Sequence, residues 1–225
     1  MARITTLPAL LALLAASGCA VNAGSGTECR NEIPLGSQEA LDACNARQLS
    51  SVPFLALKHR VGLPSERTPA MKANPDRATP SEVAQLLDYN LNYVAPCVKF
   101  TLQAVDAIHP ALVAILARGF ARSDANVARL VTRQISWGEL LRENDALGVQ
   151  AEAELEMART GIRSGSVAHD AHALEAARRQ ATMALQEWLE RHQALRRLQL
   201  RIDPKSRPPL TSCRYIGATL DCATE

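Results

Sequence analysis

Cysteine thiols are the side chains of this 225-residue sequence with the clearest potential for covalent chemistry. There are six of them, at Cys19, Cys29, Cys44, Cys97, Cys213 and Cys222. None of the spacings is C-x-x-C, so neither a thioredoxin-type redox site nor a zinc knuckle is expected. The remaining roles for these thiols are disulfide pairing, burial as small apolar groups, and covalent modification.

The segment from Cys213 to Cys222 has the pattern of a β-hairpin closed by a disulfide. Gly217 and Ala218 suit a two-residue type II′ turn, whose first position favours glycine. Folding the chain there places Cys213 opposite Cys222 in a non-hydrogen-bonded pair, where Cα atoms approach to about 4.5 Å. We expect a structural disulfide between them, because an isolated hairpin is only marginally stable in water.

Three further cysteines, Cys29, Cys44 and Cys97, lie in the first half of the chain. We favour a disulfide between Cys29 and Cys44, which closes a short loop. The alternatives are a Cys44–Cys97 disulfide, which joins two helices, and a free Cys97 thiol beside Pro96. With Cys19 set aside the number of cysteines is odd, so one thiol is left free or pairs with another chain.

The first 19 residues have the organisation of an export signal. A basic start at Arg3 is followed by an apolar stretch over residues 4–16, and Ser17 and Gly18 precede Cys19. This pattern resembles the lipobox signal of bacterial lipoproteins. The resemblance implies that residues 1–18 are a signal peptide and that Cys19 is lipidated. The chain departs from the family pattern at Ala16, where that family prefers leucine.

The lipobox resemblance also implies a location, the cell envelope. Ala20 follows the cysteine where retention in the inner membrane usually requires Asp, so the resemblance implies the outer membrane, facing the periplasm. Residues 19–28 would form a short tether. The alternative is ordinary secretion with cleavage after Ala23, which would give a soluble periplasmic or secreted protein. An uncleaved anchor is disfavoured, because spanning a membrane takes roughly 20 apolar residues.

Composition argues against nucleic acid as a partner. Without Arg3 the chain carries 24 basic and 23 acidic residues, and aromatic residues are only 4% of the sequence, so base-stacking platforms are scarce. No P-loop, G-x-G-x-x-G, G-x-S-x-G or H-E-x-x-H motif occurs. We therefore expect no cofactor and no enzyme of a class that these motifs mark.

Helix and loop signals divide the chain after residue 28 into four parts. Residues 29–57 form a short helical segment, with a helix from about Gln38 to Gln48 capped by Ser37. Residues 58–79 form a proline-rich basic loop. Residues 80–203 form a helical bundle, and residues 204–225 form a tail with the β-hairpin. For the basic loop we favour a solvated linker over a contact with anionic lipid headgroups or cell-wall polymer.

The strongest helix start is at Thr79, where Pro80 takes the first helical position and Glu82 completes a capping box. Pro96 should end or kink this helix. The next segment, residues 98–116, is apolar on nearly all sides, which predicts a central core helix that Pro110 kinks or splits.

Two long helices complete the predicted bundle. The first begins with Ser123 as its N-cap and runs to about Thr160, and the second runs from about Val167 to Leu200. Glycines and serines between them favour a turn, so we expect an antiparallel helical hairpin with coiled-coil-like packing. Trp137 would then lie near Trp188. The expected fold class is mainly α, a bundle dominated by this hairpin, with the small C-terminal disulfide-closed β-hairpin.

Other polar residues with chemical potential are few. His169 and His172 lie three apart and could hold a metal, but a polar first helical turn is favoured and no metal site is expected. Glu139 and Glu143 lie one turn apart and are expected to pair with Arg142 or Arg191. The most basic run could dock an anionic lipid or a protein partner, although cations also suit a helix C-terminus. Its members are Arg191, Arg196, Arg197, Arg201, Lys205 and Arg207.

These observations favour a lipid-anchored, non-enzymatic envelope protein that acts through contacts with another envelope protein. The C-terminal cysteine pair and the stretch Ile135–Leu141 also resemble parts of uncharacterised bacterial envelope proteins, and this resemblance implies no activity. One alternative is a periplasmic carrier of an apolar or anionic small molecule that uses residues 98–116 as a cavity wall. Another is an enzyme whose site lacks a recognisable motif.

Overall fold

The computed structural model describes the backbone of residues 18–21, 27–30, 35–164, 171–202, 211–216 and 219–224, with side chains over residues 39–164 and 171–202. The prediction of a mainly α protein is confirmed. The α-helices are α2 (Leu35–Leu49), α3 (Val52–Val61), α4 (Pro69–Lys72), α5 (Pro80–Asp88), α6 (Ala95–Asp106), α7 (Pro110–Val131), α8 (Trp137–Arg163) and α9 (Ala171–Ile202). A 3₁₀ turn, η2 (Pro64–Glu66), and a π-helical segment, η3 (Tyr89–Val94), complete the set.

Two antiparallel strand pairs lie outside the helical region of the sequence. Strand β1 (Gly18–Val21) pairs with β2 (Thr27–Arg30), and β3 (Thr211–Ile216) pairs with β4 (Thr219–Thr224). The register places Cys213 opposite Cys222. The turn residues Gly217 and Ala218 and the two cysteine side chains lie outside the described residues. The disulfide-closed hairpin therefore stays a prediction.

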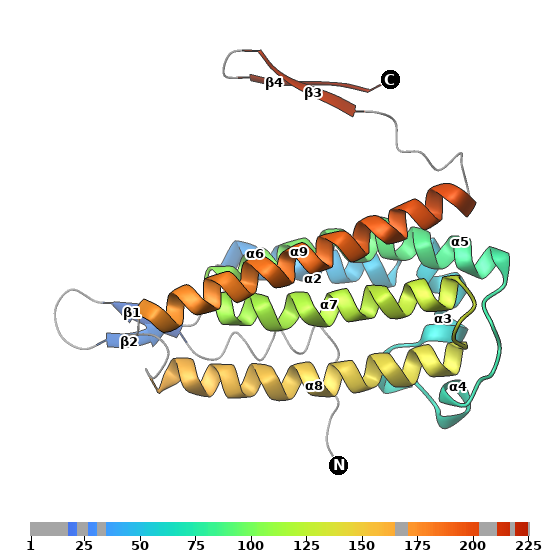
Figure 1. The fold of residues 1–225 in the computed structure, drawn as a ribbon, viewed down its shortest axis with the longest axis horizontal. Helices are drawn as coiled ribbons and strands as arrows, with labels where there is room; N and C mark the ends of the chain where they lie inside the picture. The colour runs from blue at the N-terminus through green and yellow to red at the C-terminus, as the bar shows by residue number, and fades with distance from the viewer. Residues whose placement is uncertain are drawn as a thin grey trace.

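Helix α7 is the centre of the bundle, and the long helices on either side pack against it rather than against each other. Figure 1 shows α7 between α8 and α9, with α8 antiparallel to it and α9 parallel to it. Helices α2 and α6 lie behind this layer, and α6 packs on α7. The antiparallel helical hairpin of this fold is therefore α7–α8, and α9 returns along the free side of α7.

The predicted hairpin of residues 123–160 and 167–200 is thus wrong, because the antiparallel partner of α8 is α7 and not α9. Its first helix is interrupted between Val131 and Trp137, so that Ser123, the expected cap, lies inside α7. Trp137 and Trp188 belong to two different core clusters. The physical reason is that α7 is apolar on more than one side, whereas most of α8 beyond Leu141 is exposed apart from a narrow seam that includes Leu155.

The break between α7 and α8 has clear local causes. Arg133 adopts a positive φ of 60°, a left-handed conformation that ends helices. Ser136 then caps α8: its hydroxyl accepts a hydrogen bond from the Glu139 N–H, and the Glu139 carboxylate accepts one from the Ser136 N–H. This reciprocal capping box fixes the start of α8 at Trp137.

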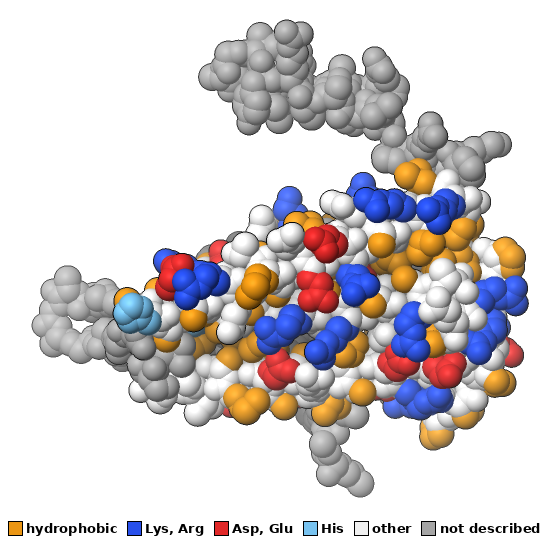
Figure 2. All heavy atoms as spheres, viewed as in Figure 1, with side chains coloured by type: hydrophobic (Ala, Val, Ile, Leu, Met, Phe, Trp, Pro, Cys, Tyr) orange, Lys and Arg blue, Asp and Glu red, His pale blue; other side chains and the backbone are white. Residues whose placement is uncertain are grey.

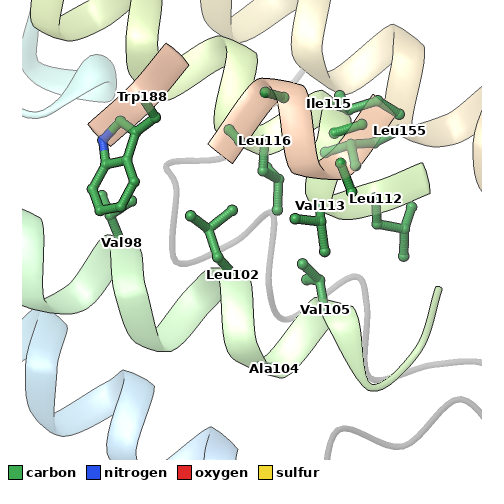
Figure 3. Close-up of a cluster of buried hydrophobic side chains, with 14 of the residues drawn as sticks. Val98, Leu102, Ala104, Val105, Leu112, Val113, Ile115, Leu116, Leu155 and Trp188 are labelled. Carbon is green, nitrogen blue, oxygen red and sulfur yellow. The ribbon is translucent and has the colours of Figure 1, made fainter. Parts of the chain in front are cut away.

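Two apolar clusters form the core. The first joins α6, α7 and α9, with contributions from Leu41 of α2 and Leu155 of α8. Figure 3 shows Val98, Leu102 and Val105 of α6 directed toward α7, and Trp188 of α9 lying beside Val98. The second cluster joins α5, the end of α7 and the start of α8, and encloses Trp137, which is fully buried. The prediction of a central core helix over residues 98–116 is correct in burial. Its expected interruption is also observed, because α6 ends at Asp106 and α7 begins at Pro110.

Residues 62–78, which we call the crossing segment, join α3 to α5 and pass over the start of α8. The predicted loop of residues 58–79 is therefore wrong at its first part, since α3 continues to Val61. The interpretation as a solvated linker is also wrong. Two backbone carbonyls of the crossing segment accept hydrogen bonds from N–H groups at the start of α8, which have no partner within the helix. Trp137 N–H donates to the Asp76 carbonyl at 3.0 Å, and Gly138 N–H donates to the Asn74 carbonyl at 3.0 Å.

A glycine is required where the crossing segment meets α8. A Cβ atom on Gly138 would lie 2.5 Å from the Lys72 carbonyl oxygen and 2.7 Å from the Asn74 carbonyl oxygen. Any larger residue would therefore push the crossing segment away from the helix.

Ion pairs explain why this basic stretch is ordered. Asp145 of α8 accepts from Arg67 and, at 2.6 Å, from Lys72. Arg60 bridges Asp76 and Glu82, each at 2.7 Å. Arg60, Arg67 and Lys72, three cations of the stretch that could have faced an anionic surface, are thus paired with carboxylates of the same chain.

Candidate functional site

The covalent chemistry that the structure describes is a disulfide between Cys44 of α2 and Cys97 of α6. Their Cα atoms lie 5.6 Å apart, inside the usual range for a disulfide. The favoured Cys29–Cys44 pairing is therefore wrong, and the alternative that joins two helices is confirmed. Cys97 lies in the first turn of α6 and is only 5% exposed, and α6 packs against α2, so the helix contact brings its sulfur to that of Cys44.

This disulfide closes a long loop, since its cysteines are separated by 53 positions in the sequence. The chain-entropy relation gives a stabilisation of about 4 kcal/mol for a loop of that length. A bond of this kind persists in oxidising compartments and is rare in the cytosol.

The other cysteines that were predicted to react lie where only the backbone is described. In the β1–β2 pair, Cys19 is opposite Cys29. Residues 1–17, which hold most of the expected signal peptide, lie outside the described residues. Lipidation of Cys19 stays a prediction. Among the helices that are described, none combines the length and apolarity needed to cross a bilayer.

The possible metal ligands do not gather into a site. Within the described side chains no cluster of three or more His, Cys, Asp or Glu residues is placed to hold a metal ion. His172 lies in the first turn of α9, whereas His169 is outside the described residues. The histidine pair therefore remains a feature of the sequence alone.

The two glutamates of the α8 start have structural roles. Hydrogen bonds from the Ser136 N–H and hydroxyl hold the pKa of Glu139 below its ordinary value, with a smaller contribution from Arg77, whose guanidinium lies 3.7 Å away. Glu143 pairs with Arg129 of α7 at 2.6 Å. The partners expected from the sequence, Arg142 and Arg191, are both replaced. Arg142 instead donates to the Lys72 carbonyl of the crossing segment.

The basic run at the end of α9 is exposed as far as it is described. Arg191, Arg196, Arg197 and Arg201 are exposed, and Lys205 and Arg207 lie outside the described residues. Figure 2 shows acidic and basic side chains interspersed over the face formed by α7, α8 and α9. Arg201 falls in the last turn of α9, where a cation suits the helix dipole.

The expected cavity wall, residues 98–116, serves as packed core. Val98, Leu102 and Val105 share one apolar cluster with Leu112 and Leu116 (Figure 3). All five side chains are at most 9% exposed. Their burial against α7 and α9 accounts for the apolar character that suggested a ligand wall.

One buried polar group was missed at the level of the sequence. Asp124 of α7 is 8% exposed, and its Oδ2 atom lies 3.8 Å from Nδ1 of His192 on α9. The His192 ring stacks on Trp188, with centroids 5.7 Å apart. Trp188 and His192 lie one helical turn apart, so their contact could be predicted from the sequence. The contact with Asp124 could not, because it depends on the packing of α7 against α9.

A second buried histidine, His109, caps α7. Its Nδ1 accepts a hydrogen bond from the Ala111 N–H at 3.1 Å, and burial lowers its pKa. The neutral imidazole is the form that this cap requires, because Nδ1 must keep a lone pair. The role is structural: it satisfies an N–H group at the helix start.

No protein-family model matches this sequence, and comparisons with curated proteins and with solved structures find no significant similarity.

Proposed function

We propose that this protein is an exported, lipid-anchored helical bundle of the bacterial cell envelope that acts through contacts with a protein partner and not as an enzyme. The observation that carries the proposal is the Cys44–Cys97 disulfide in a chain whose first 19 residues resemble a lipobox signal. A structural disulfide fits a protein that folds in an oxidising compartment, and export is the function of such a signal.

The non-enzymatic part of the proposal rests on what the candidate polar residues do. Glu139 caps α8, Glu143 pairs with Arg129, and the cations of the crossing segment pair with Asp145. These groups support the architecture. The mixed charges on the α7–α8–α9 face in Figure 2 suit a contact with a folded protein partner.

Metabolic labelling with a fatty-acid analogue tests the anchor. The wild-type protein should be labelled in cells of a Gram-negative host, and a Cys19→Ala variant should not. A Cys29→Ala variant is the matched control, because it removes a neighbouring cysteine and should keep the label. Equal labelling of the wild type and Cys19→Ala would contradict lipidation at Cys19.

Mass spectrometry after digestion without reduction tests the cysteine assignments. We propose that Cys213 and Cys222 close the C-terminal hairpin, so their peptides should be joined, as should those of Cys44 and Cys97. A thioether-linked Cys19 cannot form a disulfide. Since Cys19 lies opposite Cys29 in the β1–β2 register, a joined Cys19–Cys29 peptide would contradict lipidation and favour a soluble exported protein.

A further inference from the structure

Helix α3 exposes apolar side chains in its first half as well as burying others. Its inner side buries Pro53, Phe54 and Leu57. Its outer side leaves Val52 78% exposed and Leu55 57% exposed. An amphipathic surface helix would carry polar groups there.

These two side chains belong to a small apolar projection at the α2–α3 corner. We call Leu49, Val52 and Leu55 the corner patch. Leu49, at the end of α2, is 37% exposed, and Ser50 and Ser51 form the turn between the helices. Ser51 caps α3 by accepting from the Phe54 N–H, so the turn is fixed and holds the patch in place. Contiguous exposed apolar side chains often mark an interaction surface.

The sequence around the corner patch is basic. No Asp or Glu occurs from residue 43 to residue 65, whereas Arg47, Lys58, His59 and Arg60 fall within that range. Arg60 is neutralised by Asp76 and Glu82. Lys58 remains 49% exposed although it approaches Glu66 at 3.2 Å, and the exposed Arg47 lies over the Tyr93 ring at 5.6 Å.

The exposed apolar side chains of α8 lack this setting. On α8, Val149 is 60% exposed and Met157 is 68% exposed, values similar to those of the corner patch. Between them in the sequence lie Glu152, Glu154 and Glu156, which an anionic surface would repel.

Exposure alone does not distinguish the corner patch. The end of α9 places exposed arginines beside Leu200 and Ile202, but these two side chains are only 38% and 44% exposed. The corner patch is distinguished because it combines high exposure with flanking cations.

We propose that the corner patch docks on an anionic bilayer surface, with Val52 and Leu55 entering the headgroup region and with Arg47 and Lys58 facing the phosphates. Apolar side chains flanked by basic ones are the combination that binds such interfaces. The proposal rests on the proposed function, because the anchor at Cys19 brings the body to the membrane.

The tether allows this contact. Because the β1–β2 pairing places Cys19 opposite Cys29, the reach of the tether is set by the six residues from Cys29 to Leu35, about 20 Å when extended. The 15 residues of α2 add about 22 Å along the helix to the corner patch. The basic crossing segment, whose cations were candidates for the same role, is tied to α8 instead through Arg67 and Lys72.

The experiment is vesicle flotation of the mature chain, residues 19–225, carrying Cys19→Ser so that no acyl group contributes. Vesicles of phosphatidylcholine are compared with equimolar phosphatidylcholine and phosphatidylglycerol. We expect partitioning at least about fivefold stronger into the anionic vesicles. The double variant Val52→Ser/Leu55→Ser should weaken it about tenfold. The matched variant Val149→Ser/Met157→Ser should change it less than about twofold.

Thermal melting by circular dichroism verifies that both double variants remain folded, as expected for side chains that are mostly in solvent. A chain that does not float, or that floats equally well with either double variant, overturns the proposal. Capture of an envelope protein through the corner patch without flotation overturns it in favour of a protein partner. Fatty-acid labelling reports on Cys19 alone, and flotation of the unacylated chain reports on the corner patch alone, so the two failures are distinguishable.

Discussion

Helix α7 is held to α9 and to α8 by different kinds of contact. Toward α9 the contact is apolar and close: α9 buries Ala181, Ala184 and Trp188 in the same cluster as Ala117 and Ala121 of α7. Toward the middle of α8 the contact is polar, and we call its four cross-helix pairs the polar ladder. The pairs are Arg118–Glu154, Arg122–Gln150, Asn126–Asn144 and Arg129–Glu143.

The difference shows that the strength of a helix contact and the alignment of the two helices along each other can be determined by different side chains within one bundle. Apolar burial is strong but non-directional, so alanines and one tryptophan can hold α9 close without fixing every pair. Hydrogen bonds and ion pairs at the surface contribute little free energy, but they depend on geometry. The polar ladder therefore fixes the position of α8 along α7 more than it contributes to the free energy of the contact.

The largest expected effect is at the apolar contact. Trp188→Ala removes the widest side chain between α9 and α6 and should lower the free energy of unfolding by about 3–5 kcal/mol. Urea denaturation followed by circular dichroism at 222 nm measures it. A loss below about 1 kcal/mol would show that the α9 contact does not depend on this residue.

Overpacking the same contact should have the next largest effect. Ala181→Leu places a larger side chain at a position that is 6% exposed, and we expect a loss of about 1–3 kcal/mol in the same denaturation experiment. Ala153→Leu is the matched control on the exposed side of α8, with an expected change within about 0.5 kcal/mol. Equal changes for the two variants would contradict the close approach of α7 and α9.

A smaller effect is expected at the polar ladder. A double-mutant cycle of Arg118→Ala and Glu154→Ala should give a coupling below about 1 kcal/mol, because the side chains are 38% and 28% exposed. Raising the ionic strength to about 1 M should reduce the coupling further. A coupling of several kcal/mol that is insensitive to salt would contradict the description of the ladder as weak.

The smallest expected effect is a pH dependence. Hydrogen bonds from the side chain of Gln150 and then from Arg118 lower the pKa of Glu154. A lowered folded-state pKa means that this stabilisation is present above the unfolded-state carboxyl pKa, about 4.3, and is lost as the pH falls through the folded-state value. Stability of Glu154→Gln measured from about pH 6 to pH 3 should therefore fall less steeply than that of the wild type. An identical slope for the two proteins would contradict the pKa shift.

Local signals predicted several boundaries of the fold correctly. The capping box of Thr79 and Glu82, with Pro80 at the first helical position, begins α5 as expected. Pro110 begins α7. These signals depend on backbone groups that are close in sequence, so they can be recognised without knowledge of the tertiary structure.

The break between α7 and α8 could also have been predicted. Ser136 and Glu139 have the spacing of a capping box. The prediction instead placed the cap at Ser123 and ran one continuous helix through Ser136. Ser123 lies within α7, where tertiary packing overrides its modest helix propensity. The error moved the hairpin partner of α8 from α7 to α9.

Other features depend on contacts that sequence patterns do not encode. The pairing of Asp145 with Arg67 and Lys72 spans more than 70 residues, and the hydrogen bond from the Gly138 N–H to the Asn74 carbonyl spans more than 60. Pro96 was expected to end or kink a helix. The chain accommodates it through the π-helical segment Tyr89–Val94, which widens the turns before the proline and lets helical structure continue into α6.

The disulfide between α2 and α6 has a mechanical consequence. A pull on the N-terminal end of the chain passes from Cys44 to Cys97 through one covalent bond, so it reaches α6 without acting on the residues between them. The disulfide closes a covalent loop that contains helices α3, α4 and α5 and the crossing segment. A protease cut within that loop would leave the two fragments joined until a reductant is added.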